Sequence, residues 1–399
     1  MGILIRFGGA KAKAFTYCII VCGLMAAALE VRAQSNVFGN TNPAPPSASG
    51  PLLASEGYTD ENGWSWPGNE WKHVSPQSER FSADRFDALQ IFPKTHQTDA
   101  MMVIVRGHVI FEYGDTKLVS KTASVRKSVL SLLYAVAMQK GVKFDLDQTV
   151  VQLGLEDKRP LIEPQQHATL QQLLMSRSGI YIVNGNGEQD KLSPKRGSSY
   201  PGVRWFYNNW DFDAAGLAFE KIAHKDIFDA LRDDLAIPLR FQDFDRARQK
   251  KNYVENSTHS EYATYLSARD MARLGLLAIS HGLWGKTLWA DPGFIDYSVY
   301  PSTNFAGRNE FKAEGWTGRW GYGMLWWAWE VPMYPGNAWS GPYQGAFSAM
   351  GAGGQYITAF PAYDLVVVHK VNIDVDPHRN VTEPTYMTIL GMVLDAKCD

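Results

Sequence analysis

Ser124 and Lys127 are the residues of this chain whose types and spacing point most directly to covalent chemistry. The tetrapeptide Ser124-Val125-Arg126-Lys127 opens the most apolar helical stretch of the sequence. Residues three apart in a helix lie on one face, so the hydroxyl and the amine come together. The helix start adds free backbone N–H groups and a positive dipole end, which stabilise a developing oxyanion. A lysine buried in such a helix loses its proton more easily, and a neutral amine beside a serine is a general base that activates a nucleophile.

The tetrapeptide alone leaves a structural alternative open. A Ser-x-x-Lys sequence is expected about once by chance in a chain of this length. The same residues would also suit an N-cap serine followed by a solvated lysine. Further motifs are therefore needed before the chemistry can be favoured.

A second candidate is Tyr207-Asn208-Asn209, at the end of the aromatic segment 201–210. On an extended or turn segment, side chains two residues apart point the same way, which pairs Tyr207 with Asn209. A phenol can carry a proton, and an amide can orient a lysine or a substrate. The alternative is an aromatic turn that takes no part in chemistry.

A third candidate is the glycine-rich stretch at 350–356, Met-Gly-Ala-Gly-Gly-Gln-Tyr, which precedes an apolar strand pattern. Glycines at the start of a strand let a substrate or another backbone approach closely. The alternative is a bulge in an edge strand.

The elements that must position these motifs follow from the apolar patterns. Strands are predicted at 101–105 and 109–113, as a hairpin, and again at 321–329, 354–360 and 364–371. Helices are predicted at about 125–140, 170–175, 213–224, 227–234, 268–281 and 384–395. Strands at both ends around a helical middle predict an α/β (α+β) fold, in which helices flank an antiparallel sheet and a mainly helical domain is added.

The N-terminus has the pattern of an export signal. Arg6, Lys11 and Lys13 precede an apolar stretch at 14–29, and Ala33 suits cleavage, so residues 1–33 are predicted to be removed from a periplasmic or secreted protein. An uncleaved membrane anchor is the alternative. Residues 34–75, rich in Pro, Ser and Gly, are predicted to form an arm whose tryptophans dock onto the body. The remaining residues, 76–399, form the predicted main domain, with an α/β part at about 76–140 and 295–399 and a helical part at about 141–294.

Composition excludes several classes of function. The 399 residues include 39 basic and 41 acidic side chains, so there is no surplus of charge for binding nucleic acid. Cys18 and Cys22 lie in the signal, which leaves Cys398 without a disulfide partner. Beyond the signal no apolar run is long enough to span a membrane. The sequence has no dinucleotide fingerprint and no metal-ligand spacing, so neither a cofactor nor a metal is expected.

The order and spacing of the three motifs resemble the serine β-lactamase and penicillin-binding-protein superfamily, and within it the class C-like esterase branch. The resemblance covers about 80–395 and extends to the stretches at 173–180, 267–275 and 360–368. It implies a β-lactamase-like fold and hydrolysis of a small-molecule ester or amide, without a cofactor. Ser124 would be the acylated nucleophile, Lys127 its base and Tyr207 the proton carrier.

The resemblance also implies which residues bind the substrate. Asn209 would position Lys127 or the substrate, and Ala352, Gly353 and Gly354 would form the third motif. The oxyanion hole would consist of the backbone N–H groups of Ser124 and Gln355. Trp210, which follows the second motif, is expected in an apolar pocket wall.

One residue departs from the family pattern. Members that bind a substrate carboxylate usually carry Lys or His at the first position of the third motif, where this chain has Ala352. The loss of that cation removes a contact typically contributing about 1.5–3 kcal/mol, so an uncharged substrate is favoured. A penicillin-interacting β-lactamase or D,D-peptidase, or a non-catalytic binding module on the same fold, remains the alternative. No pattern in the sequence indicates an oligomeric state.

Overall fold

Eight strands form the main sheet, in the spatial order β12-β13-β14-β15-β16-β4-β5-β3. All neighbouring strands are antiparallel except β3 and β5, which run parallel. The computed structural model describes residues 55–187, 192–304, 315–330 and 341–398, and the predicted export signal at 1–33 lies outside them. The strands of the sheet are β3 (Lys72–His73), β4 (Ala100–Val105), β5 (His108–Gly114), β12 (Trp320–Tyr322), β13 (Trp327–Trp329), β14 (Phe347–Gly351), β15 (Gln355–Phe360) and β16 (Leu365–Lys370).

The predicted hairpin at 101–113 is confirmed as β4 and β5. Its turn has positive φ at both central residues, Arg106 (48°) and Gly107 (79°), the geometry that suits the twist of a two-residue hairpin. Every residue of β4 is buried, because the sheet is covered on both faces.

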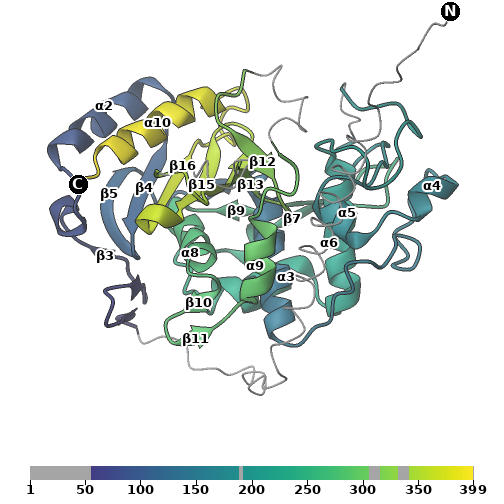
Figure 1. The fold of residues 1–399 in the computed structure, drawn as a ribbon, viewed down its shortest axis with the longest axis horizontal. Coiled ribbons are helices and arrows are strands. Elements are labelled where there is room, and N and C mark those ends of the chain that lie inside the picture. The colour runs from purple at the N-terminus through teal and green to yellow at the C-terminus, as the bar shows by residue number, and fades with distance from the viewer. Residues whose placement is uncertain (1–54, 188–191, 305–314, 331–340, 399) are drawn as a thin grey trace, which may run out of the picture. The chain divides into compact units, whose positions relative to one another are not determined.

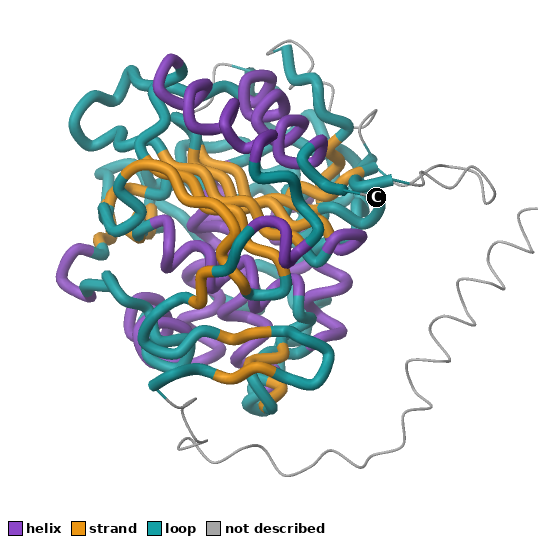
Figure 2. Tube along the Cα trace, turned by 90° about the vertical axis from the view of Figure 1, so that its left-hand side faces the viewer, coloured by secondary structure: helices purple, strands orange, loops and turns teal. Residues whose placement is uncertain are grey.

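Helices cover the sheet on both sides, as Figure 2 shows. On one face lie α3 (Val125–Gln139) and α8 (Ala268–Ile279), and a Cβ on Gly275 of α8 would stand 2.6 Å from Val366 of β16. On the other face lie α2 (Asp87–Thr95) and α10 (Glu383–Asp395), which pack side by side (Figure 1). Tyr386 of α10 stacks on Tyr356 of β15 with the ring centroids 3.9 Å apart. This arrangement confirms the predicted sheet flanked by helices.

The helical part packs against the far side of α3. It contains α4 (Glu163–Gln166), α5 (Leu170–Leu174), α6 (Asn209–Ala223), α7 (Ile227–Ala230), the π-helical turn η3 (Leu231–Ala236) and α9 (Pro292–Ser298). With neighbours on both sides, α3 buries thirteen of its fifteen residues. The helix that follows Ser124 is thus the buried helix that its apolar sequence predicts.

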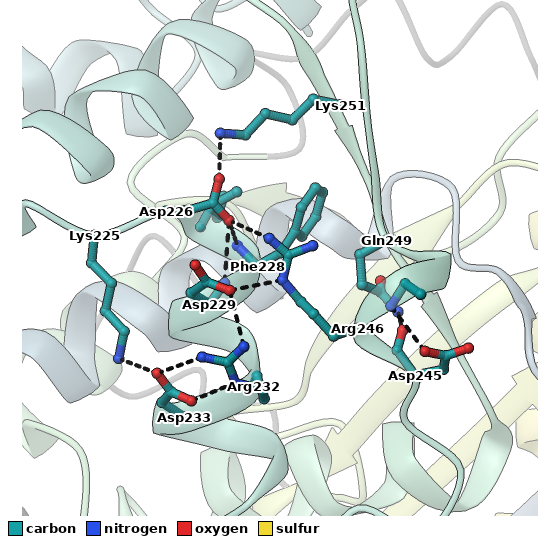
Figure 3. Close-up of polar contacts among 12 residues, drawn as sticks. Lys225, Asp226, Phe228, Asp229, Arg232, Asp233, Asp245, Arg246, Gln249 and Lys251 are labelled. Atoms are coloured by element: carbon teal, nitrogen blue, oxygen red, sulfur yellow. Dashed lines mark hydrogen bonds and ion pairs between the residues drawn. The ribbon is translucent and has the colours of Figure 1, made fainter.

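An ion-pair network joins α7 and η3 to the neighbouring segments, as Figure 3 shows. Asp226, at the N-cap of α7, binds Arg246 at 3.0 Å and Lys251 at 2.7 Å, and Asp229 binds Arg246 at 2.9 Å. Because these side chains are partly exposed, each pair contributes little to stability, and the network links α7 to Arg246 and to β7 (Lys250–Asn252).

The remaining elements are short ribbons and 3-10 turns. The two-stranded ribbons are β1 (Tyr58–Thr59) with β2 (Ser65–Trp66), β6 (Ser120–Lys121) with β9 (Tyr265–Leu266), β7 (Lys250–Asn252) with β8 (Glu261–Ala263), and β10 (Leu283–Trp284) with β11 (Thr287–Leu288). The 3-10 turns are η1 (Pro76–Glu79), η2 (Asp84–Phe86), η4 (Arg246–Arg248) and η7 (Pro361–Tyr363).

Three features differ from the sequence-based expectations. The strand predicted at 321–329 is two short strands, because the chain turns at Leu325, where φ is +66°. Helix α8 falls within the range predicted for the helical part, yet it packs on the sheet. The described end of the N-terminal arm contributes β3 to the main sheet, where no strand was predicted. The tryptophans of the arm do dock onto the body as predicted, since Trp66 and Trp71 donate hydrogen bonds to the carbonyls of Leu283 and Arg269.

No helix in the described part of the chain is long and apolar enough to cross a membrane.

Candidate active site

The start of α3 brings Ser124 and Lys127 together. Ser124 is the N-cap residue of α3, and one helical turn later Lys127 donates a hydrogen bond from Nζ to Ser124 Oγ at 2.6 Å. Ala123, just before the serine, has φ of +47°, a strained conformation for a residue with a Cβ. Such strain is often found at functional sites, where the surrounding fold holds it in place.

Lys127 lies in an environment that favours its neutral amine. The side chain is buried, and its Nζ stands 4.8 Å from the ring centre of Tyr207 and 4.9 Å from that of Phe212. Burial lowers the pKa of Lys127 well below the ordinary value for an amine, and the charge of Arg126 lowers it further. Among the ion pairs of the described residues, none includes Lys127. A neutral amine within hydrogen-bond distance of a hydroxyl is poised to accept its proton.

Tyr207 is a second partner of the Ser124 side chain. Burial raises the pKa of Tyr207 to about 12, although its hydrogen bond with Ser124 and the nearby Arg126 act in the opposite direction. Tyr207 is therefore a neutral phenol near pH 7, with a proton to donate. It lies just before α6, at the end of the aromatic segment that the sequence singled out.

The turn between β14 and β15 forms the edge of the site. A Cβ on Gly351 would lie 2.5 Å from the carbonyl oxygen of Thr122 and 3.0 Å from the backbone nitrogen of Ser124, so only glycine fits there. Gly353 and Gly354 have φ of +79° and +101°, which glycine adopts without strain. This explains why the third motif is rich in glycine.

A cavity of about 420 Å³ opens above Ser124. Part of its wall is aromatic: the rings of Tyr207 and Trp327 stack with centroids 5.6 Å apart, and Trp316 packs against Trp327 with centroids 4.7 Å apart. The described residues that line it are Ser124, Tyr207, Trp316, Trp327, Met350, Gly351, Ala352, Gly353, Tyr356, Asn380, Thr382, Glu383 and Pro384. Among these residues the one side chain that carries a full charge is that of Glu383.

Glu383 is a buried carboxylate in the cavity wall, at the start of α10. Its oxygens accept hydrogen bonds from the backbone N–H groups of Thr317 and Gly318, both at 2.8 Å, and from the indole of Trp320 at 3.2 Å. These bonds hold the backbone that carries Trp316 and thus the aromatic wall. No sequence motif indicates Glu383, because the helix-start pattern Thr-Glu-Pro does not show that α10 begins beside the cavity.

The structure brings together part of the predicted site. Ser124, Lys127 and Tyr207 are in contact, and Ala352 and Gly353 line the cavity. Gly354 is not among the lining residues, since it packs against Val371 and Val381.

Gln355 was expected to supply an oxyanion-hole N–H, but it lies on β15, beyond the strand that borders Ser124. It is fully buried, is not a lining residue, and its side chain donates to the carbonyl of Val371 at 2.7 Å. The backbone beside Ser124 is instead that of Gly351, the last residue of β14.

Asn209 and Trp210 are the first two residues of α6. Asn208 before them is extended, with φ of −111° and ψ of 105°, and within the described part of the chain the side chain of Asn209 makes no hydrogen bond. Trp210 is fully buried in the core, where its indole donates to Asp157 Oδ2 at 2.7 Å, and it does not line the cavity.

Within the described ranges, no group of three or more His, Cys, Asp and Glu side chains is arranged to hold a metal ion.

Residues 92–391 match the family model described as Beta-lactamase, and the chain therefore belongs to the β-lactamase family of serine hydrolases. A comparison with curated proteins finds no match.

Solved structures share the fold at low sequence identity. A Bacillus anthracis protein provisionally named a 6-aminohexanoate-dimer hydrolase has a TM-score of 0.55 and 16% identity, with 82% of this chain and 86% of that chain covered. EstCE1, a hydrolase with promiscuous acyltransferase activity, has a TM-score of 0.52 and 15% identity, with 81% and 100% covered. A penicillin-binding protein from Bacillus halodurans has a TM-score of 0.52 and 12% identity, with 75% and 98% covered. At such identities the likeness establishes the fold, and the chemistry must be argued from the site.

Proposed function

We propose that this chain hydrolyses an uncharged ester or amide through an acyl intermediate on Ser124, as a member of the class C-like esterase branch of its family. The observation that carries the proposal is the 2.6 Å hydrogen bond between Lys127 Nζ and Ser124 Oγ, with the amine buried against two aromatic rings.

Acylation would proceed as follows. Lys127 takes the proton of Ser124, and the oxygen attacks the substrate carbonyl carbon to give a tetrahedral oxyanion. The oxyanion accepts hydrogen bonds from the N–H of Ser124 and from a backbone N–H of the turn 351–353, in place of Gln355. Tyr207 donates its proton to the leaving oxygen or nitrogen and recovers one from the ammonium of Lys127. Water then attacks the acyl-serine along the reverse route, which releases the acid and restores the hydroxyl.

The cavity lining supports an uncharged substrate. Ala352 stands where related carboxylate-binding enzymes carry a cation, and the described lining residues contribute the carboxylate of Glu383 but no Lys, Arg or His. A substrate carboxylate would meet an acidic neighbour without a counter-charge and would lose its hydration at a cost. The aromatic wall formed by Trp316 and Trp327 favours an apolar acyl or leaving group.

The test is steady-state hydrolysis of a panel of p-nitrophenyl esters and anilides by the purified protein. Ser124→Ala and Lys127→Met are expected to remove turnover. Ser128→Ala is the matched control, because Ser128 is a buried serine on the same helix that bonds the carbonyl of Leu325 and does not line the cavity. Full turnover in Ser124→Ala, or no turnover of any ester or amide by the wild type, would refute the proposal and favour a non-catalytic binding module.

The family supports one alternative, a penicillin-interacting β-lactamase or D,D-peptidase. Labelling by a fluorescent penicillin separates the two. Weak or absent labelling is expected from the uncharged cavity, whereas rapid labelling at Ser124 would mean that the protein recognises a substrate carboxylate by another route.

We also propose that the protein is exported and cleaved after Ala33, on the strength of the signal pattern at 1–33. N-terminal sequencing of the protein recovered from outside the cytoplasm tests this, and a chain that retains Met1 would contradict it.

A further inference from the structure

A buried cluster of charges lies directly behind the Ser124–Lys127 pair. Arg126 of α3 is 2% exposed and binds Asp213 Oδ1 of α6 at 2.9 Å. Glu261 of β8 lies 3.8 Å from the same guanidinium. Side chains from α3, α6 and β8 thus meet at one buried arginine.

The cluster is held rigidly. The second oxygen of Asp213 accepts a hydrogen bond from the backbone N–H of Gly185 at 3.0 Å, and the guanidinium of Arg126 lies 4.3 Å above the ring of Tyr262. An arginine fixed by a carboxylate and an aromatic ring keeps its charge at every pH at which proteins fold. The cation therefore remains next to the helix start permanently.

Lys127 follows Arg126 in the chain and shares this interior. Asp213 follows Phe212, whose ring faces Lys127 Nζ at 4.9 Å. The amine binds Ser124 Oγ, and no carboxylate of the described residues forms an ion pair with it. Two positive charges on neighbouring buried residues repel strongly, because little water screens them.

We propose that Arg126 is a positioning residue whose fixed charge adds to the effect of burial in disfavouring protonation of the Lys127 amine, while Asp213 and Glu261 act in the opposite direction. The proposal rests on the proposed function, in which Lys127 must be neutral to accept the proton of Ser124. Arg126, which lies between Ser124 and Lys127 in the sequence, would then influence the acid–base chemistry of the site. An ion pair that serves only stability would not do so.

Several other groups around Lys127 also influence its pKa. Burial is the largest influence on the pKa of Lys127; Arg126 and the more distant Lys121 lower it further, whereas Asp213 and Glu261 raise it. The titratable and charged groups that face this interior are Ser124 and Arg126 on α3, Tyr207 and Asp213 at α6, Glu261 and Tyr262 on β8, Lys121 on β6 and Tyr322 on β12. The tyrosines are neutral near pH 7, since burial raises the pKa of each.

The experiment follows the rate at which a fluorophosphonate labels Ser124 as the pH is varied across the range in which lysine titrates. Fluoride leaves without a proton, so the rate reports on the activation of the nucleophile. In the wild type the labelling rate should decrease at low pH, where Lys127 is protonated and cannot accept the proton of Ser124. This decrease forms the acidic limb of the plot of labelling rate against pH. Arg126→Met should move the acidic limb to higher pH by about one unit or more.

Two further variants keep the test decisive if Arg126→Met folds poorly. The double variant Arg126→Met/Asp213→Asn removes the buried pair together, and should move the limb upward by less than the single variant, because the lost carboxylate acts in the opposite direction. Glu261→Gln keeps its hydrogen bond with Asn252 and should move the limb to lower pH. Opposite shifts for the two signs of charge are not expected from a loss of stability alone.

Arg273→Met is the matched control. Arg273 is also a fully buried arginine, on α8, but it bonds the carbonyls of Pro67 and Leu239 and is not among the groups that chiefly shift the pKa of Lys127. Its variant should leave the limb in place. If Ser124 of the wild type is not labelled at all, the proposed function fails. If Ser124 is labelled but the limb of the arginine variants stays in place or moves downward, the role of Arg126 is overturned.

Discussion

Lys370 is a second buried lysine, and its substitution should change how the stability of the protein depends on pH. Its Nζ donates to the carbonyls of Ser120 at 3.1 Å and Leu266 at 2.6 Å, which are partners in the β6–β9 ribbon. The ribbon leads into the strained backbone before Ser124. Lys370 therefore connects the segment that leads to Ser124 with the C-terminal end of β16.

The size of the effect follows from the pKa. Burial lowers the pKa of Lys370 from 10.5 to about 7. Because the unfolded chain binds this proton more tightly than the folded chain, protonation favours unfolding. The free energy of unfolding should therefore rise as the pH increases from about 7 toward 10.5, and it should fall when the pH is lowered back toward 7. Between about pH 7 and about pH 9 the deprotonation of Lys370 alone should raise the free energy of unfolding by about 2 kcal/mol. The full difference between the protonated and the deprotonated limits is about 5 kcal/mol.

Urea titrations of the wild type and of Lys370→Met at several pH values in this window test the prediction. The carbonyls of Ser120 and Leu266 lose the Lys370 donor in the variant at every pH, so the comparison is between slopes and not between absolute values. Lys72→Met, which removes an exposed lysine from β3 of the same sheet, is the control and should keep the wild-type slope. Equal slopes in the wild type and Lys370→Met would refute the reasoning, because a lysine with an ordinary pKa would give no such difference.

Three further predictions concern the site and its surroundings. Tyr207→Phe should lower kcat by about 10²- to 10⁴-fold with little change in KM, as expected when a proton donor is lost, and single-turnover kinetics would show whether the acylation step slows. Trp210→Phe should lower the free energy of unfolding by about 1–3 kcal/mol, because Asp157 loses a hydrogen bond, and should leave KM unchanged; a large rise in KM would place Trp210 in the substrate site after all. Glu383→Ala should release the backbone that carries Trp316 and raise KM about tenfold or more for aryl esters but less for acetate esters of small alcohols; an equal rise for both would contradict the anchoring role.

The parts of the site that lie within one element could be predicted from the sequence. Ser124 and Lys127 are one helical turn apart, so their contact follows from helix geometry once the helix is recognised. The buried character of α3 and the hairpin of β4 and β5 likewise follow from local apolar patterns.

The parts that depend on the packing of distant elements could not be predicted. Gln355 was placed in the oxyanion hole because it follows the glycines, whereas the register of β14 and β15 sets Gly351 beside Ser124 and Gln355 one strand away. Trp210 is the second residue of α6, and its side chain lies in the core. A prediction that places this segment in an extended or turn conformation cannot show where the helix begins or which side chains it buries. The same holds for Glu383, which is 259 positions from Ser124 and meets the cavity through the fold alone.

The most direct test of the central claim is the mass of the Ser124 peptide during turnover. The wild type is mixed with a p-nitrophenyl ester, quenched in acid at short times, digested and analysed by mass spectrometry. The mechanism predicts that the acyl group appears on the peptide containing Ser124 in step with a burst of p-nitrophenol, and that it disappears as the substrate is exhausted. Steady turnover with the acyl group on another residue, or with the Ser124 peptide unmodified throughout, would contradict the account.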